Sequence, residues 1–416
     1  MKEETEASLS FDAKGLSPED AVAQLLEHAA NLRVSDLFFN TNEESVAVAA
    51  RHWGILRHLS TLPLETGRRC ISHIKALSGM NVTERRRPQD GRWLFERPSG
   101  RVLDLRLNSL PTLHGEDMTL RILDRDNRLI AIEELGFRRR DYNLLLQLLN
   151  NPSGLLLVTG LAGSGKTTTL YACLRYLNNG ERKINTIEDP IEYSIDGLRQ
   201  SQVNSKLDIG FAELLRSVLR QAPDIIMIGE IRDPETAETA VRAANSGHLV
   251  LATLHAPVAA GAIQSMLRLG VHAHFLSSSL LGVVAQRLIR TLCPKCRLAF
   301  DISYAPHTFD EIKQWLEPGQ GDFLYGPKGC RECYMTGYSG RTGVFEVLTV
   351  SPEIRRMIEE RQATDTIRRR AIEEGLVEFR PSALLKVAQG ETSVEEVVRV
   401  VPSEFLSADG MADRTP

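Results

Sequence analysis

The sequence predicts an α/β protein of several domains, built around a mainly parallel β-sheet with helices on both faces. Three observations predict it. Apolar, strand-like runs alternate with helical segments between residues 141 and 290. A glycine-rich loop joins one of these runs to a helix, and two C-x-x-C pairs follow further along the chain. Because 416 residues exceed one ordinary hydrophobic core, we expect two or three domains.

The first part of the chain predicts a separate α+β domain. Residues 1–17 are polar and acidic, and we expect them to be disordered. A helix is expected after them, with Ser17 as N-cap and Pro18 at its first position. Alternating apolar residues then favour a small antiparallel sheet, and a second helix is expected from about Glu65 to Gly79.

The boundaries of this first domain follow from turn and charge signals. Residues 115–117 (Gly-Glu-Asp) are expected to form the turn between its last two strands. We therefore place the domain at residues 18–124. Residues 125–140 are rich in charge and are expected to connect it to the next domain, residues 141–290.

The glycine-rich loop carries the pattern G-x-x-x-x-G-K-[ST], which predicts a P-loop NTPase core. An apolar run at residues 155–158 precedes it and a helical segment follows, which is the context that a phosphate-binding loop requires. Backbone N–H groups, the Lys166 ammonium and the Thr167 hydroxyl would bind phosphates and Mg²⁺. The expected nucleotide-binding residues are Gly160, Leu161, Ala162, Gly163, Ser164, Gly165, Lys166, Thr167 and Thr168.

Three polar residues follow neighbouring strands of the predicted sheet. Glu188, Glu230 and His255 each come at or just after the end of an apolar run. Because parallel strands end at one edge of a sheet, we expect these side chains to lie near the phosphate loop. Glu230 would orient the attacking water, Glu188 would assist and hold Mg²⁺ through water, and His255 would sense the γ-phosphate. A turn acid or a structural histidine is the alternative.

Four of the six cysteines predict a zinc site. Cys293, Cys296, Cys330 and Cys333 form C-P-K-C and C-R-E-C, and four thiolates suit a closed tetrahedral Zn²⁺ site. Such a site leaves no open coordination position, so it would organise a subdomain, residues 291–345, and not catalyse. Free thiols are the alternative. Residues 346–402 are expected to form a helical subdomain and residues 403–416 a frayed tail.

Charge and hydropathy limit the classes of protein. The net charge of −4 argues against a protein whose main task is to coat nucleic acid. The first residues do not form a signal peptide, and no run of about 18 apolar residues occurs. We therefore expect a cytoplasmic protein that reaches a membrane only through partners.

Together these motifs resemble the type II secretion and type IV pilus assembly ATPases, the general secretion pathway protein E and PilB-like family. The resemblance covers roughly residues 18–400. The stretches that carry it are GLAGSGKTTTLYA, TIEDPIEY, LLRSVLRQAPDIIMIGEIRD, LATLH, LLGVVAQRLIRTLCPKC and GCRECYMTGYSGRTGVFEVL.

This resemblance implies a fold, an assembly and a set of partners. The fold would be a RecA-like motor domain with a PAS-like N-terminal domain. The assembly would be a homo-hexamer at the cytoplasmic face of the inner membrane. There it would use ATP hydrolysis to move a platform protein that builds a pseudopilus or a pilus. Acidic phospholipid is a further expected partner, and no specific nucleic acid is expected.

The resemblance also implies residue roles. It puts Glu188 in the family's aspartate box, Glu230 in an atypical Walker B motif and His255 in the histidine box. Segments around Arg106 and Arg121 resemble the part of the N-terminal domain that supplies arginines to the nucleotide. The tetracysteine motif argues against a retraction motor. A DNA-uptake motor of the same machinery, a nucleic-acid translocase and a non-hydrolysing scaffold remain as alternatives.

Overall fold

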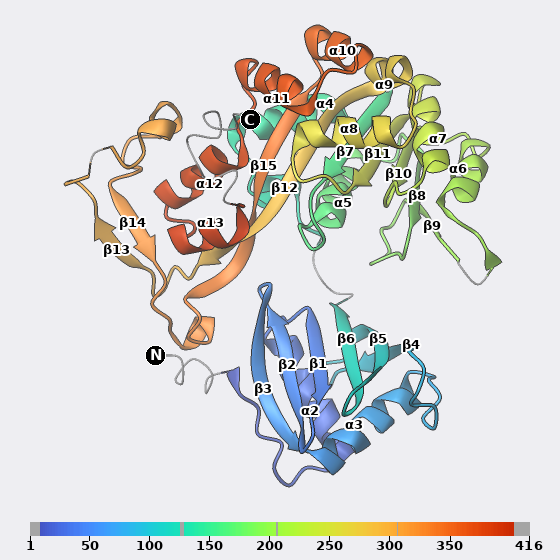
Figure 1. Cartoon of the computed structure of the whole chain (residues 1–416), viewed down its shortest axis with the longest axis vertical. Helices are drawn as coiled ribbons and strands as arrows, with labels where there is room; N and C mark the ends of the chain where they lie inside the picture. The colour runs from blue at the N-terminus through green and yellow to red at the C-terminus, as the bar shows by residue number, and fades with distance from the viewer. Residues whose placement is uncertain (1–8, 125–128, 205–206, 306, 403–416) are drawn as a thin grey trace, which may run out of the picture. The chain divides into compact units, whose positions relative to one another are not determined.

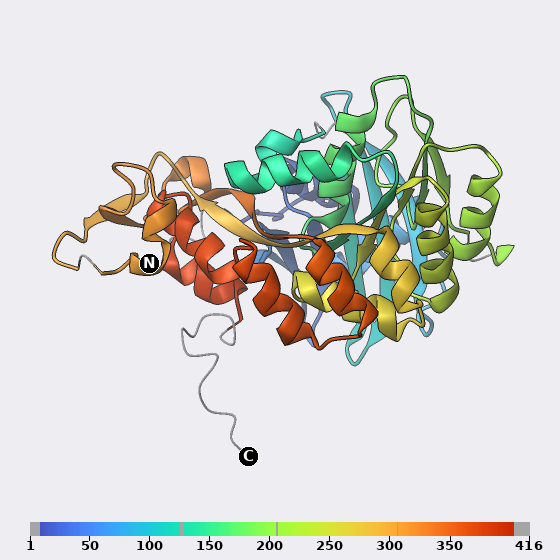
Figure 2. The ribbon, with the colours of Figure 1, turned by 90° about the horizontal axis from the view of Figure 1, so that it is seen from above.

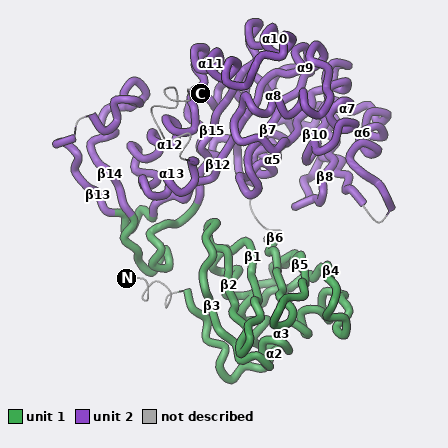
Figure 3. Tube along the Cα trace, in the orientation of Figure 1, with its two compact units in different colours: residues 1–128, 293–297, 327–340 green, residues 129–292, 298–326, 341–416 purple. Residues whose placement is uncertain are grey.

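The structure is a computed structural model, and it describes residues 9–124, 129–204, 207–305 and 307–402. Two compact units divide the chain (Figure 3). Unit 1 comprises residues up to 128 together with residues 293–297 and 327–340. Unit 2 comprises residues 129–292, 298–326 and 341 onwards. Each is described by itself.

A six-stranded antiparallel sheet forms the centre of unit 1, with strand order β3-β2-β1-β6-β5-β4 (Figure 1). Two helices pack on each other and on this sheet. Their bounds are α2 (Pro18–Asn31) and α3 (Leu64–Leu77). The strands are β1 (Asp36–Thr41), β2 (Ser45–His52), β3 (Ile55–Pro63), β4 (Gln89–Glu96), β5 (Val102–Thr112) and β6 (Gly115–Asp124). The expected antiparallel sheet is confirmed. So is the helix start, since the Ser17 side chain accepts a hydrogen bond from the N–H of Asp20.

Two expectations for unit 1 were wrong. We expected disorder over residues 1–17, but Leu9 is buried in the core and the N–H of Phe11 donates to the carbonyl of Leu59 at 2.7 Å; residues 1–8 lie outside the described part. We also expected a turn at residues 115–117, but β6 begins at Gly115. The turn falls two residues earlier, at residues 113–114, and Glu116 lies in β6, where it pairs with the buried Lys75.

A seven-stranded sheet forms the centre of unit 2, with strand order β15-β12-β7-β11-β10-β8-β9. The neighbouring pairs from β12 through β7, β11, β10 and β8 to β9 are parallel, as predicted. The strands are β7 (Gly154–Thr159), β8 (Ile184–Glu188), β9 (Arg199–Gln202), β10 (Ile225–Ile228), β11 (Leu249–Leu254), β12 (Leu280–Leu292) and β15 (Tyr338–Thr349). A separate pair, β13 (Leu298–Asp301) and β14 (Phe323–Gly326), forms a small two-stranded sheet.

Helices cover both faces of the large sheet. Alternate residues of β7 show it: Leu155 and Leu157 pack with α6 to α13, whereas Leu156 and Val158 pack with α4 and α5. Figure 2 shows α4 and the helices of residues 352–400 on opposite sides of the strands. The helices are α4 (Arg139–Leu149), α5 (Lys166–Leu177), α6 (Phe211–Leu219), α7 (Pro234–Asn245), α8 (Ala259–Arg268), α9 (Ala273–Ser279), α10 (Pro352–Glu359), α11 (Thr364–Glu373), α12 (Phe379–Ala388) and α13 (Val394–Val400).

Two segments of unit 2 differ from expectation. The expected connector at residues 125–140 includes Ile132 and Leu135 of a short 3-10 helix (Ile132–Leu135), and both side chains are buried against α4 and α5. Residues 291–345 do not form one unit, because β15 joins the large sheet and the cysteine segments belong to unit 1. Among the described residues, no helix is long and apolar enough to cross a membrane.

Candidate functional site

The phosphate loop joins the buried strand β7 to the start of α5. Gly160, Gly163 and Gly165 adopt φ values of 149°, 73° and 89°, a region that side-chain-bearing residues rarely occupy. A Cβ atom at Gly160 would lie 2.5 Å from the carbonyl oxygen of Gln286. The loop therefore needs glycine at these positions, and it turns the chain so that α5 begins at Lys166.

Lys166 is held against this loop. Its Nζ donates to the carbonyls of Gly160 at 2.9 Å and Leu161 at 3.1 Å. Burial lowers the pKa of Lys166, and the negative charge of Glu230 opposes that lowering. The Glu230 carboxylate and the Lys166 ammonium therefore interact electrostatically.

The rest of the loop divides into exposed and buried parts. Leu161, Ala162 and Gly163 are exposed, and Thr167 and Thr168 are half-buried. The carbonyl of Ser164 accepts a hydrogen bond from Gln286 Nε2 at 2.8 Å, whereas its buried hydroxyl has no hydrogen-bond partner among the described residues. Gln286 of β12 therefore supports the loop, and its place in the sequence, more than 100 residues away, gave no signal of it.

Glu230 lies at the end of β10, beside the end of β11. Its carboxylate pairs with Arg232 and lies 3.5 Å from Nε2 of His255. The Thr253 hydroxyl donates to the carbonyl of Gly229 and joins the two strand ends. The Glu230 side chain is 12% exposed and that of His255 is 51% exposed, so a carboxylate and an imidazole lie together at one accessible edge of the sheet.

Glu188 lies inside the protein instead. It is 3% exposed, and its Oε1 accepts from the Thr186 hydroxyl at 2.5 Å and from Gln200 Nε2 at 3.1 Å. Its Oε2 accepts from the Tyr171 hydroxyl. Burial and the charge of Glu188 raise the pKa of Tyr171. A metal ion bound directly to Glu188 would displace at least one of these hydrogen-bond donors. A metal ion that contacts Glu188 through a water molecule would leave the donors in place.

Arg106 and Arg121 belong to unit 1. They lie opposite each other on β5 and β6, and Nε of Arg121 donates to Oδ1 of Asp36 at 3.2 Å. Since the neighbouring Leu105 and Leu120 are buried, the two arginines lie on the other face of the sheet. The Arg121 side chain is 68% exposed.

The four paired cysteines converge on one point of unit 1. All four Sγ atoms lie within 4.8 Å of one another, and three close pairs are separated by 3.7 to 3.9 Å. A tetrahedral Zn²⁺ with Zn–S bonds of about 2.3 Å needs sulfur atoms about 3.8 Å apart. The Sγ of Cys333 also accepts the N–H groups of Cys330 and Gly337, both at 3.2 Å. The cluster could therefore hold zinc.

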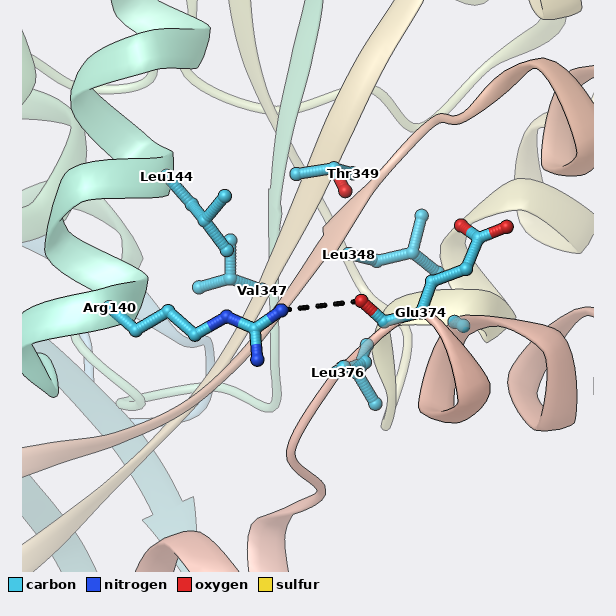
Figure 4. Close-up of a pocket in the computed structure, with 9 residues that line it drawn as sticks. Arg140, Leu144, Val347, Leu348, Thr349, Glu374 and Leu376 are labelled. Carbon is cyan, nitrogen blue, oxygen red and sulfur yellow. Dashed lines mark hydrogen bonds between the residues drawn. The ribbon is translucent and has the colours of Figure 1, made fainter. Parts of the chain in front are cut away.

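A small cavity of about 90 Å³ lies in another part of unit 2, between α4, β15 and α11 (Figure 4). Arg140 reaches across it and donates to the carbonyl of Glu374 at 3.3 Å, near the C-terminal end of α11. No phosphate-loop residue lines it. The cavity surrounds this hydrogen bond between α4 and the end of α11, and it is not the nucleotide site.

The parallel sheet, the glycine loop with its lysine and the carboxylate at the neighbouring strand end define a P-loop NTPase. The family model described as "Type II/IV secretion system protein" matches residues 13–399. The chain belongs to this family, whose members hydrolyse ATP, and it is an ATP-hydrolysing enzyme.

Individual relatives agree with this assignment. The chain is 42% identical to the type II secretion system protein E of Pseudomonas aeruginosa over 383 residues, which cover 91% of this chain and 74% of that protein. It is 41% identical to the type IV pilus assembly ATPase PilB of Acinetobacter baylyi, covering 91% of this chain and 65% of that protein. The X-ray structure of the Legionella pneumophila ATPase DotB shares the fold, with a TM-score of 0.69, 22% identity and coverage of 94% and 97%.

Proposed function

We propose that this chain is the motor ATPase of a type II secretion system or of type IV pilus assembly. The observation that carries the proposal is the gathering of Lys166, Glu230 and His255 at the phosphate loop. It is supported by the 42% identity to a type II secretion system protein E. The chain would work as a homo-hexamer on a platform protein of the inner membrane, at its cytoplasmic face, with acidic phospholipid as a possible activator.

Each residue has a role in this proposal. The loop N–H groups and Lys166 bind the phosphates, and Thr167 offers a hydroxyl to Mg²⁺. Mg²⁺ supplies neutralising charge at the β- and γ-phosphates. Glu230 accepts a hydrogen bond from the attacking water and orients it, and His255 contacts the γ-phosphate side of the site.

Three more residues act around this centre. Glu188, held by Tyr171, Thr186 and Gln200, assists by fixing the end of β8 and contacts Mg²⁺ through water. Arg106 and Arg121 supply positive charge to the nucleotide and couple hydrolysis to domain closure. Cys293, Cys296, Cys330 and Cys333 hold structural Zn²⁺.

The role of Glu230 is tested by separating binding from turnover. Glu230→Gln should lower kcat by about 100-fold or more while ATP affinity stays near that of the wild type, because the phosphate contacts remain. Lys166→Ala should lose nucleotide binding. Glu238→Gln is the matched control, since Glu238 is an exposed helix residue paired with Arg242. Equal turnover in Glu230→Gln and in this control would contradict the proposal.

A DNA-uptake motor of the same machinery and a nucleic-acid translocase remain the alternatives. The translocase predicts that DNA stimulates ATP hydrolysis. The net charge of −4 speaks against a large DNA-binding face.

A further inference from the structure

Glu346 is a buried acid in the middle of β15 that none of the roles above uses. It is 3% exposed. Its Oε2 accepts the N–H of Ala259 at 2.9 Å, and its Oε1 accepts the N–H of Phe379 at 3.3 Å. Ala259 is the first residue of α8 and Phe379 the first residue of α12. One carboxylate therefore caps the N-termini of two helices, each of which leaves unsatisfied N–H groups and a partial positive charge at its start.

The first of these helices is joined directly to the candidate active site. His255 directly follows the strand β11, and α8 begins four residues after His255. Within this short turn the N–H of Ala256 donates to Oγ1 of Thr159 at 2.7 Å, and Thr159 is the last residue of β7 before the phosphate loop. Thr159 thus fixes the start of the turn and Glu346 fixes its end.

The second helix belongs to the C-terminal part of the chain. Helix α12 packs with α13, and Phe379 is buried in the same core as Ala259 and Ile263 of α8. The side chain of Arg287 lies 4.9 Å above the Phe379 ring and donates to the carbonyl of Pro257 in the turn at 3.5 Å. The turn after His255 and the start of α12 therefore share both Glu346 and Arg287.

We infer that Glu346 is a positioning residue for ATP hydrolysis: its carboxylate joins the C-terminal helices to the turn that sets His255 against Glu230. This rests on the proposed role of His255. Without the carboxylate the start of α8 loses its acceptor, and the turn is held only at the Thr159 end. The start of α12 is then no longer tied to the turn after His255, and the imidazole and Glu230 lose their fixed spacing.

The charge of Glu346 depends on its surroundings. Burial raises its pKa to about 7, although both N–H donors and Arg368 of α11 favour the ionised form. Glu378, which precedes α12 and pairs with Arg368, raises the pKa further. Arg287 is the other charged group packed against this region. Protonation puts a hydrogen on one of the two accepting oxygens, so the double cap should weaken as pH falls below about 7.

The test compares Glu346→Gln with Glu378→Gln, which makes the same chemical change at the neighbouring, half-buried acid. Amide hydrogen exchange is read by mass spectrometry. In Glu346→Gln, residues 256–262 or residues 379–383 should exchange about tenfold faster, because the amide keeps one accepting oxygen and turns an N–H donor toward the other helix start. Residues 154–159 and 166–177 should exchange as in the wild type. Unchanged exchange in both helix starts overturns the inference.

ATP hydrolysis supplies the second measurement. Glu346→Gln should lower kcat by about five- to tenfold with the KM for ATP within about twofold, because the phosphate loop is untouched. In the wild type, kcat should rise as pH increases through about 7. In Glu346→Gln this rise of kcat with pH should be absent. Unchanged kcat, or an unchanged pH profile, overturns the inference.

Two further comparisons keep the result clear. If Glu346→Gln does not fold, the wild type itself is measured at pH 6 and pH 8, and the two helix starts should be better protected at pH 8 after correction for intrinsic exchange. Equal protection overturns the inference. His255→Ala tests the other premise: if it leaves turnover unchanged, the proposed role of His255 fails, while the exchange result still decides whether Glu346 couples the two helices.

Discussion

Glu230 and Glu188 show how differently two strand-end carboxylates can be placed. Glu230 lies between Arg232 and His255 at an accessible edge, where a carboxylate can accept a hydrogen bond from water. Glu188 is enclosed by Tyr171, Thr186 and Gln200, so its oxygens are already occupied. Position at the end of a strand is visible in the sequence, but the direction of the side chain depends on partners from other elements.

Glu346 gives a prediction for the pH dependence of stability. Its pKa is about 7 in the folded protein and 4.5 as its ordinary value, so between these pH values the folded state binds the proton more tightly. For global unfolding, which hydrates the carboxylate, the stability that this residue contributes is therefore full below about pH 4.5 and is lost as pH rises through about 7, although the two hydrogen bonds that it accepts are strongest in the ionised form. The loss is about 3 kcal/mol at most.

The measurement is urea unfolding of the wild type and of Glu346→Gln at pH 5, 6, 7 and 8. The difference in unfolding free energy should shift in favour of the variant as pH rises. A difference that is constant across this range would show that Glu346 does not titrate as described.

Lys75 and Glu116 form a buried pair in unit 1 that gives a second prediction at this scale. Lys75 is 0% exposed, and its Nζ lies 2.6 Å from Oε1 of Glu116 and 2.6 Å from the carbonyl of Glu84. Glu116→Ala should destabilise the protein by about 3–5 kcal/mol, because it leaves a buried charge without its partner. Lys75→Met with Glu116→Leu should recover most of that loss. Thermal unfolding of both variants tests this prediction. A smaller loss of stability in Glu116→Ala than in the double variant would contradict it.

At the scale of the element, local signals predicted most starts of helices and strands. Ser17, Asp233 and Ser351 each accept a hydrogen bond from the backbone of the helix they precede, and capping residues followed by proline are visible in the sequence. The phosphate loop was predictable for the same reason, since its glycines and lysine lie close together in the sequence, at residues 160–166. The turn at residues 113–114 was not predicted, because Leu113 and His114 are not turn-favouring residues whereas the Gly-Glu-Asp that follows them includes two.

The cysteine segments are the element whose placement the sequence could not predict. Their spacing predicted the cluster, but their grouping with unit 1 depends on Tyr334, which packs in that core with its ring 6.1 Å from that of His52. No local pattern indicates this contact. Zinc should therefore stabilise unit 1 as well as the cysteine segments that bind it.

Removal of one ligand tests this. Cys330→Ser should lower the zinc content from one ion per chain to nearly none, measured by inductively coupled plasma mass spectrometry, and should lower Tm by several degrees. Cys173→Ser is the control, since Cys173 is buried away from the cluster in unit 2. Full zinc content in Cys330→Ser would contradict the four-cysteine site.

At the scale of the whole molecule, the sequence predicted the central sheet and the nucleotide loop but not the grouping of residues 293–297 and 327–340 with unit 1. The chain crosses between the two units several times, so that residues 293–297 and 327–340 join unit 1. Contacts such as Gln286 to Ser164 and Glu346 to both Ala259 and Phe379 join residues 33 to 122 positions apart. Such pairs are set by the packing of strands and helices, which composition and periodicity do not reveal.

The most direct test of the central claim is steady-state ATP hydrolysis under three conditions, with Glu230→Gln as the blank. The protein is measured alone, with single-stranded DNA, and with the cytoplasmic part of its platform protein plus vesicles of acidic phospholipid. Our account predicts that platform protein and lipid stimulate hydrolysis and that Glu230→Gln abolishes it. Stimulation by DNA, with none by platform protein and lipid, would contradict the account and place the chain among nucleic-acid translocases.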